Sequence, residues 1–199
     1  GSISDIGCFS FFPSKNLGAY GDAGMMISNS QEYSEKVRIL SQHGSKLKYH
    51  YELLGINSRL DTIQAAILNV KLKYLDSWTE KRRKIAETYT QAFSKFDSIV
   101  TPKNLENAFH VYHQYTIRVL NGRDDLQMFL HEKGIQTMIY YPVPLHLQKI
   151  HQHLGYKEGD FPNAEKAAKE VLSLPVFPEL TIEEQSYIIN TIKGYFKKL

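Results

Sequence analysis

The sequence contains a single cysteine, Cys8, so no disulfide can form within the chain. It has no apolar run long enough to cross a membrane, and its first residues lack the layout of a signal peptide. The formal net charge of +3 is too small to indicate a nucleic-acid partner. These absences leave a chain of ordinary globular composition, 42% hydrophobic and 23% charged, for which the cytoplasm is the expected compartment.

Several catalytic motifs are absent as well. No Ser-His-Asp order and no Gly-x-Ser-x-Gly elbow appears, so acyl-transfer chemistry has no support. Gly18, Gly21 and Gly24 do not form a dinucleotide fingerprint, because no helical pattern opens directly behind them. The histidines at 110 and 113, and those at 146, 151 and 153, lack nearby thiolates and a convincing carboxylate partner, so no metal site is expected.

One lysine lies at the end of an aromatic strand. Residues 5–12 read as a buried strand, which Pro13 ends because it has no N–H to donate. Lys15 is therefore expected in a turn beside apolar surface, where desolvation favours a neutral, nucleophilic amine. Two interpretations remain open: a Schiff-base lysine, or a loop lysine whose stem lies over the aromatic side chains. The residues alone favour the loop lysine.

The wider segment resembles a known family. Ser10-Phe11-Phe12-Pro13-Ser14-Lys15-Asn16-Leu17-Gly18, followed by Gly21-Asp22-Ala23-Gly24, is similar to the cofactor-lysine segment of the DegT/DnrJ/EryC1/StrS aminotransferases. These are pyridoxal-phosphate (PLP) enzymes that aminate keto sugars attached to nucleotides. Further landmarks run in family order over nearly the whole chain, at residues 43–44, 55–61, 64–67, 113–115, 140–148, 159–162 and 172–178.

The resemblance implies a fold class, α/β plus α+β, in which the chain is the C-terminal half of a fold-type I PLP aminotransferase. Residues 1–78 would be the end of the large cofactor domain, and residues 79–199 a small C-terminal α+β domain. The lysine segment lies near the middle of the family's enzymes, so the earlier strands of the cofactor domain are expected outside this chain. The 199 residues alone are then expected to bind PLP poorly and to be inactive.

The family pattern also implies roles at the cofactor. Lys15 would carry PLP as a Schiff base and then move the proton between substrate and cofactor carbons. Ser10 and Asn57 match ligands of the cofactor phosphate, and Asn57 would reach across a homodimer into the partner's site. Ser10 is equally explained as a buried serine bonded to backbone. Asn57 also fits a helix cap.

Five further residues match positions near the substrate: Arg59, Tyr140, Tyr141, His146 and His43. A structural ion pair explains Arg59 equally well. A helix-end histidine beside terminal carbonyls explains His43. Many relatives carry histidine at the position of Tyr140. Because of this departure, the resemblance does not decide whether Tyr140 contacts the substrate.

The implied reaction is transfer of an amino group, in the family usually from L-glutamate, to a nucleotide-linked keto sugar. The residues around Lys15 slightly favour C3 amination of a UDP-linked acetamido sugar. The alternative is a non-catalytic regulatory or structural member, which the retained Lys15 disfavours. Dehydrating relatives carry histidine in place of the lysine, so Lys15 disfavours dehydration too. No nucleic-acid or membrane partner is expected.

Apolar periodicity predicts the helices. They are expected at 31–42 with Ser30 as N-cap, at 58–96 with a capping box over 58–61 and a bend near 76–77, and at 123–133, 161–172 and 183–198, the last with a Thr181–Glu184 capping box. The strands are expected at 24–28, 111–120 and 136–141, with a loop over 45–56. Residues 81–84, a basic run, are expected on a solvated helix face.

Overall fold

The computed structural model describes residues 3–197. Backbone packing divides the chain into two compact units, Gly1–Asp76 and Ser77–Leu199. The assignment of residues 1–78 and 79–199 to two domains of an aminotransferase stays a prediction. No helix among residues 3–197 is both long and apolar enough to span a membrane.

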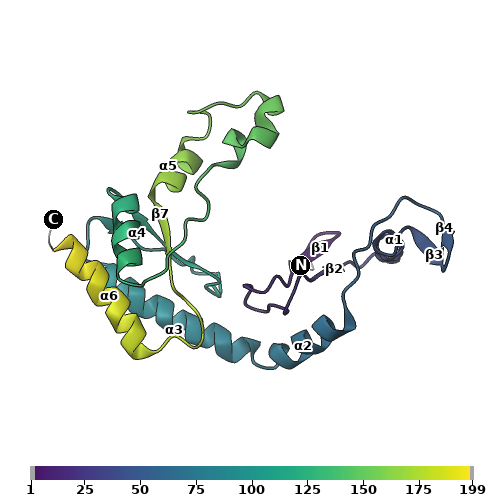
Figure 1. Ribbon diagram of the computed structural model, residues 1–199, viewed down its shortest axis with the longest axis horizontal. Helices are drawn as coiled ribbons and strands as arrows, with labels where there is room; N and C mark the ends of the chain where they lie inside the picture. Colours follow the sequence, from purple (N-terminus) through teal and green to yellow (C-terminus); the bar gives the residue numbers. More distant parts are fainter. Residues whose placement is uncertain (1–2, 198–199) are drawn as a thin grey trace. The chain divides into compact units, whose positions relative to one another are not determined.

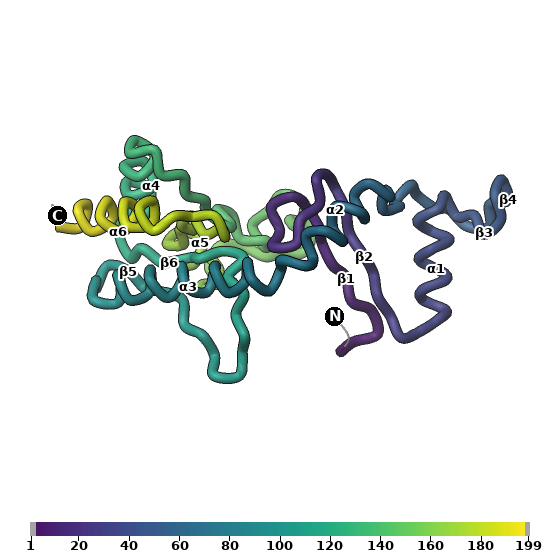
Figure 2. Tube along the Cα trace, turned by 90° about the horizontal axis from the view of Figure 1, so that it is seen from below, coloured from purple at the N-terminus to yellow at the C-terminus, as the bar shows by residue number. Residues whose placement is uncertain are grey.

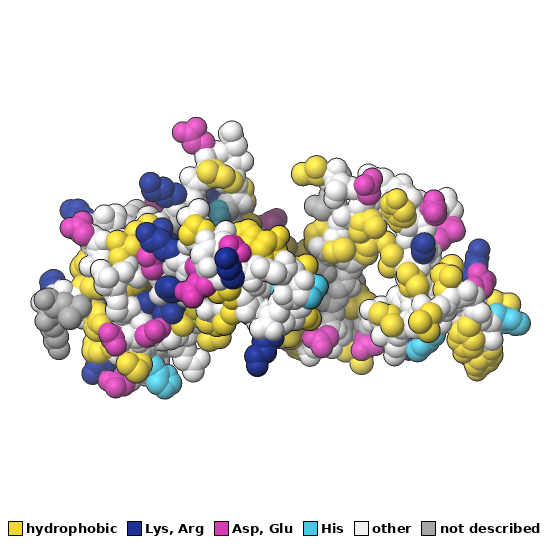
Figure 3. Space-filling model, turned by 90° about the horizontal axis from the view of Figure 1, so that it is seen from above, with side chains coloured by type: hydrophobic (Ala, Val, Ile, Leu, Met, Phe, Trp, Pro, Cys, Tyr) yellow, Lys and Arg dark blue, Asp and Glu magenta, His cyan; other side chains and the backbone are white. Residues whose placement is uncertain are grey.

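The N-terminal unit consists of two short antiparallel hairpins and two helices (Figure 1). Strand β1 pairs with β2 so that Cys8 lies opposite Met26. Hydrophobic side chains gather on the surface over this unit, at the right of Figure 3. In chain order its elements are β1 (Gly7–Ser10), β2 (Gly24–Ile27), α1 (Gln31–Ser41), β3 (Ser45–Leu47), β4 (His50–Tyr51) and α2 (Thr62–Leu72).

Local hydrogen bonds explain where the helices of this unit begin. The Ser30 hydroxyl accepts a bond from the Tyr33 amide at 3.3 Å, which confirms it as the N-cap of α1. The capping box expected over 58–61 is wrong, because α2 begins at Thr62 and Asp61 caps it without a side-chain bond. The Ser58 amide instead donates to the Ser41 carbonyl at 3.0 Å, which ties this residue to the end of α1. The loop expected over 45–56 contains the β3–β4 hairpin.

The C-terminal unit is a three-stranded antiparallel sheet, in the order β5-β6-β7, with helices packed against it (Figure 1). Figure 2 shows a long loop between β5 and β6. In chain order the elements are α3 (Leu75–Phe93), β5 (Ile99–Val100), β6 (Tyr115–Val119), α4 (Arg123–Glu132), the 3-10 helices η1 (Leu145–Leu147) and η2 (Lys149–Leu154), α5 (Pro162–Glu170), β7 (Val171–Leu174) and α6 (Ile182–Phe196).

The core of the C-terminal unit follows from the spacing of apolar residues, which recur every second residue in a strand and about every 3.6 residues in a helix. Along β6, every second residue is buried, as the pleat of a half-covered sheet requires. Helices α3, α4 and α6 supply the opposing apolar side chains at helical spacing. The largest fully buried side chains of this core are Tyr89, Phe93, Tyr115, Ile117, Val119, Leu126, Leu130, Leu172 and Ile192.

Four element predictions needed correction, three in this unit and one at its junction with the N-terminal unit. The strand expected over 111–120 is shorter, because β6 spans Tyr115–Val119. The helix expected to Leu172 ends at Glu170, because Val171–Leu174 pairs with β6 as strand β7. The strand expected over 136–141 is a single bridge between Met138 and Ser173. The long helix is interrupted between Leu72 and Leu75, a few residues before the expected bend. The α6 capping box is confirmed, while Lys198 lies outside the described residues.

The basic run over 81–84 is not wholly solvated. Arg82 is buried, and its guanidinium donates to the carbonyls of Tyr112, His113 and Val176 at 3.3, 3.3 and 2.7 Å. The reason is helical spacing, since Arg82 falls on the face of α3 that also buries Ala86 and Tyr89. A prediction from the run of charges alone misses this residue, because it does not consider which face of the helix each position occupies.

Candidate functional site

Lys15 lies in the closed turn that joins β1 to β2. Its amide donates to the Phe12 carbonyl at 2.8 Å, and the Phe11 amide continues the hairpin by donating to Ala23 at 2.8 Å. The Lys15 side chain is exposed. The burial expected for this amine is therefore wrong for the chain alone, because the aromatic side chains around the turn do not cover it. The position in a turn after the strand is as predicted.

Ser10 ends β1 and is exposed, so the prediction of a buried serine is wrong. Its hydroxyl accepts a hydrogen bond from the Phe12 amide at 3.3 Å, which is the backbone bond that the structural interpretation requires. A hydroxyl that accepts one bond can also donate one, so this contact leaves Ser10 chemically able to bind a phosphate oxygen.

Asn57 and Arg59 are joined to each other. The Arg59 Nε donates to Asn57 Oδ1 at 3.1 Å, and both side chains are exposed. A β-bridge between Asn57 and Gln42 holds this segment against the end of α1. Asn57 is thus neither a helix cap nor buried, and Arg59 pairs with an amide rather than a carboxylate in the described contacts.

A hollow of about 630 Å³ brings several of these residues together within the N-terminal unit. Ser10, Asn57 and Arg59 line it, together with Asp22 and the glycine at the start of β2. Hydroxyl, amide and guanidinium groups are all donors that suit phosphate oxygens. Lys15 and His43 are not among its lining residues.

His43 follows Gln42, the C-cap of α1, and has a left-handed φ of 63°. Its amide donates to the Ile56 carbonyl at 3.0 Å, so its backbone ties the helix end to the segment before Asn57. Gly44 follows at φ 77°, and a Cβ there would lie 1.7 Å from the Leu53 carbonyl oxygen. Only glycine fits this close approach.

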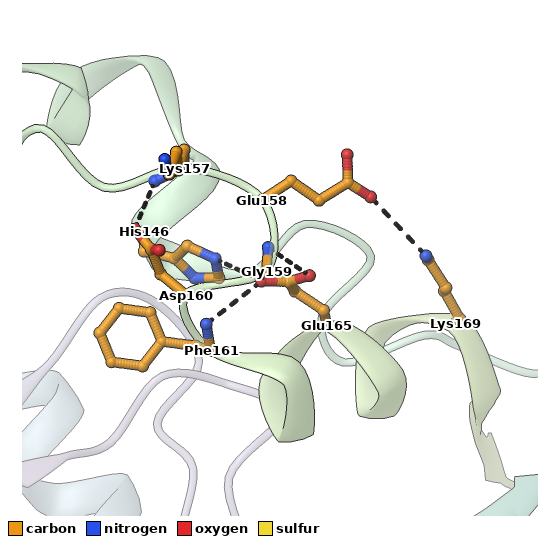
Figure 4. Close-up of polar contacts among 8 residues, drawn as sticks. All are labelled: His146, Lys157, Glu158, Gly159, Asp160, Phe161, Glu165 and Lys169. Carbon is orange, nitrogen blue, oxygen red and sulfur yellow. Dashed lines mark hydrogen bonds and ion pairs between the residues drawn. The ribbon is translucent and has the colours of Figure 1, made fainter.

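The predicted substrate residues of the C-terminal unit separate into two groups. Tyr140 and Tyr141 are exposed, and their rings meet edge to face with centroids 5.7 Å apart. They line a hollow of about 400 Å³ beside η1 and α5. His146 is buried instead, and its Nε2 lies 3.0 Å from Glu165 Oε1 (Figure 4). The substrate contact predicted for His146 stays a prediction, and this geometry favours a structural role.

Glu165 is the centre of a polar cluster that the sequence interpretation missed. Its carboxylate accepts from the Gly159 amide at 2.9 and 3.0 Å, from the Phe161 amide at 3.3 Å and from His146 (Figure 4). Burial acts to raise the pKa of this carboxyl, but the bonds outweigh it and hold the pKa below its ordinary value. Its only sequence signal is an acid in the first turn after Pro162.

The described residues 3–197 contain no group of three metal-ligating side chains placed to hold a metal ion. The polar groups described above for the N-terminal unit are the Lys15 amine, the Ser10 hydroxyl, the Asn57 amide and the Arg59 guanidinium.

The model of the DegT/DnrJ/EryC1/StrS aminotransferase family matches residues 1–193. The chain belongs to the DegT/DnrJ/EryC1/StrS aminotransferase family. This confirms the resemblance seen in the sequence. The chain spans about half the length of the curated relatives it matches.

Among the curated relatives of this family member, a protein from Geobacillus stearothermophilus named "Pleiotropic regulatory protein" is 56% identical over 99% of this chain and 53% of its own. The "UDP-N-acetyl-3-dehydro-alpha-D-glucosamine 3-aminotranferase" of Acidithiobacillus ferrooxidans is 45% identical over 97% of this chain and 51% of its own. The two names describe different kinds of role.

Solved structures of family members share this fold. S. venezuelae DesV in complex with a ketimine intermediate matches with a TM-score of 0.90 and 37% identity, over 96% of this chain and 51% of that chain. NtdA from Bacillus subtilis with bound PMP matches with a TM-score of 0.86 and 32% identity, over 98% of this chain and 46% of that chain. The predicted fold class of a PLP aminotransferase is thereby confirmed.

Proposed function

We propose that this protein is a PLP-dependent aminotransferase that transfers an amino group, with L-glutamate as donor, to a nucleotide-linked keto sugar. The observation that carries the proposal is a lysine, Lys15, in the closed β1–β2 turn of a chain that the family model matches over residues 1–193. Names of relatives that describe sugar aminotransferases support the same reaction.

The residues present fit the cofactor. A primary amine at Lys15 suits the PLP aldehyde, and the donors of Ser10, Asn57 and Arg59 share one hollow of the size of a small ligand site. When bound, PLP supplies an electron-withdrawing ring that stabilises negative charge on the reacting carbon. Ser10 would hold the phosphate together with Asn57 of the partner subunit, and the Lys15 Nζ would move the proton at the reacting carbon.

The test of this proposal is the visible absorption band of PLP linked to the enzyme. We expect the native protein, including any residues that flank this chain, to show the band and to form amino-sugar product. Lys15→Ala should lose both, since no other residue between β1 and β2 carries an amine. Lys46→Ala, which changes an exposed lysine of β3, should keep both. A Lys15→Ala protein that retains the band and the turnover would contradict the proposal.

For the substrate we propose a UDP-linked acetamido sugar aminated at C3. The sequence around Lys15 and the name of the 45% identical relative support it. A panel of UDP- and dTDP-linked 3-keto and 4-keto sugars, with the amino sugars identified by mass spectrometry and NMR, tests the choice. Product from the UDP-linked 3-keto sugar alone is the expected result, and product from a 4-keto sugar alone would overturn it.

We propose a homodimer in which Asn57 serves the partner's cofactor. Ser10 and Asn57 line the same hollow of one chain, so the alternative is that Asn57 serves its own. Mixed dimers of Lys15→Ala and Asn57→Ala chains separate the two. If Asn57 acts across the interface, random mixing restores about a quarter of wild-type activity, because half the dimers hold one intact site. If it acts within its own chain, no intact site forms and activity stays absent.

A non-catalytic regulatory role is the second candidate, because a 56% identical relative is named a regulatory protein. Absence of PLP binding and of turnover in the native protein would favour this role. We also propose that the 199 residues by themselves are inactive, since the Lys15 side chain is exposed in them. Detectable transamination by these residues alone would contradict that part.

A further inference from the structure

The loop that carries Lys15 is closed at its base. The Ala19 amide donates to the Phe11 carbonyl at 2.8 Å, which joins the two ends of the loop. At Gly18 the backbone touches the start of the loop, because a Cβ there would lie 2.3 Å from the Pro13 carbonyl oxygen. Ala19 is 1% exposed, so the base is packed although the Lys15 side chain is not. The direction in which Lys15 projects therefore depends on what holds this base.

Two side chains of α2 hold it. Gln64 Oε1 accepts a hydrogen bond from the Tyr20 amide at 2.8 Å. The Lys71 ammonium donates to the Gly18 carbonyl, and its Nζ lies 5.2 Å from the centroid of the Tyr20 ring. Gln64 and Lys71 are seven residues apart, which places them two turns apart on one face of the helix. Both side chains are half-buried.

The fit between α2 and the loop is close. A Cβ on Gly21 would lie 3.1 Å from Gln64 Nε2, so the chain after the base passes directly over this amide. The Lys71 bond is charge-assisted, and such bonds are stronger than those between neutral groups. The Lys71 ammonium binds the Gly18 carbonyl and lies near the Tyr20 ring, and the Gln64 amide oxygen accepts from the Tyr20 N–H. Together these contacts fix the base at two adjacent peptide groups.

We propose that Gln64 and Lys71 are positioning residues, which anchor the Lys15 loop onto α2 and so set where the Lys15 amine meets the cofactor. The catalytic half of this inference rests on the proposed function. The structural half does not, because the contacts are present in the chain itself. The proposal also gives a role to the 64–67 segment, which the proposed reaction leaves without one.

The first experiment measures anchoring without PLP. In Gln64→Leu and Lys71→Met forms of the native protein, amide hydrogen exchange at Tyr20 should be about tenfold faster, since each change removes a hydrogen-bond partner of the base. Gln64→Glu and Lys71→Arg keep an acceptor and a donor, and they should retain slow exchange. Lys73→Met, at an exposed lysine just after α2, is the matched control. Exchange unchanged in all variants would overturn the anchoring.

The second experiment measures positioning in the PLP-loaded protein. Lys71→Met should lower kcat by about 100-fold while KM for the sugar nucleotide changes little, because a small displacement of a reacting amine is costly. Lys71→Arg should keep most of the wild-type kcat. If Lys71 had only a structural role, Lys71→Met would lower the thermal midpoint of unfolding without lowering kcat selectively relative to KM. Unchanged kcat with faster exchange would overturn the positioning role. A wild-type protein that neither links PLP nor turns over would instead refute the proposed function, and exchange would still decide the anchoring.

Discussion

The two units of this chain bury apolar side chains to very different extents. In the C-terminal unit a continuous core joins helices α3, α4 and α6 to the sheet. Among the described residues of the N-terminal unit, Ala19 and Leu68 are the buried hydrophobic ones. Large apolar side chains lie on its surface instead, among them Phe12, Tyr20, Leu47, Leu54 and Ile56.

The unit that contains Lys15, Ser10 and Asn57, the residues proposed to serve the cofactor, therefore buries the fewest apolar side chains. The C-terminal unit is held by burial, which is the dominant favourable term in folding. The N-terminal unit is held by hairpin bonds, tight glycine turns and the α2 contacts at residues 18–21. We therefore expect the C-terminal unit to dominate cooperative unfolding of this chain, and the N-terminal unit to gain stability when its apolar surface is covered.

The largest expected effect compares two phenylalanines. Phe93 is 0% exposed in the core of the C-terminal unit, and Phe12 is 51% exposed beside the Lys15 turn. Phe93→Ala should lower the free energy of unfolding by about 3–5 kcal/mol. Phe12→Ala should change it by no more than about 0.5 kcal/mol. Urea unfolding followed by the fluorescence of Trp78 measures both, and similar losses would break the comparison.

The next effect compares two neighbouring arginines of α3. Arg82→Met leaves buried carbonyls without their donor and should lower the free energy of unfolding by about 1–3 kcal/mol. Arg83 is more exposed, with its guanidinium 4.1 Å from the centroid of the Phe109 ring, so Arg83→Met should cost about 0.5–1 kcal/mol. The same unfolding assay decides, and an equal or larger loss at Arg83 would show that Arg82 is not the structural member of the pair.

The smallest effect is a pH dependence confined to the C-terminal unit. The folded-state pKa of Glu165 lies below its ordinary value of 4.5, so its ionised form stabilises the fold above that value. That stabilisation is lost as the pH falls through the folded-state pKa. The stability difference between wild type and Glu165→Gln should thus be full at neutral pH and shrink below pH 4.5. Thermal unfolding between pH 7 and pH 3 measures it.

The control for this prediction is Glu158→Gln. Glu158 is exposed and lies 3.9 Å from Lys169, so its ion pair contributes little (Figure 4). A difference for Glu165→Gln that does not change with pH would mean that the cluster is held by something other than the carboxylate.

The sequence predicts those features of the fold that local chemistry decides. Ser30 and Thr181 cap α1 and α6 as expected, because each accepts a bond from an amide three residues on. Strands at the places of β1 and β2 are predicted from their apolar residues, whereas their antiparallel pairing comes from the structure. Family landmarks predict the class of the fold because they extend along nearly the whole chain.

Features decided by distant partners are not predicted. Residues 171–174 follow a helix without a breaker, and only pairing with β6 makes them a strand. The segment at 136–141 has strand-like residues but finds one bridge at Met138. The candidate site shows the same limit. Ser10, Asn57 and Arg59 line one hollow, as their predicted roles require. The contact between His146 and Glu165, nineteen residues later, is not predicted from the sequence.

The exposure of Lys15 has the same cause. A turn position can be predicted from Pro13 and the glycines, but the atoms that cover a side chain are set by whatever packs over the turn. The anchoring role of Gln64 and Lys71 could not be predicted, because a polar residue within a helix carries no signal of a distant partner. Their role is visible only once α2 lies against residues 18–21.

The most direct test of the central claim, that Lys15 carries the cofactor, is chemical trapping. Native protein is incubated with PLP, reduced with borohydride, digested and analysed by mass spectrometry. A pyridoxyl group on the Lys15 peptide, absent from the Lys15→Ala protein, is the predicted result. A label on another lysine in a protein that still forms amino sugar would contradict the claim.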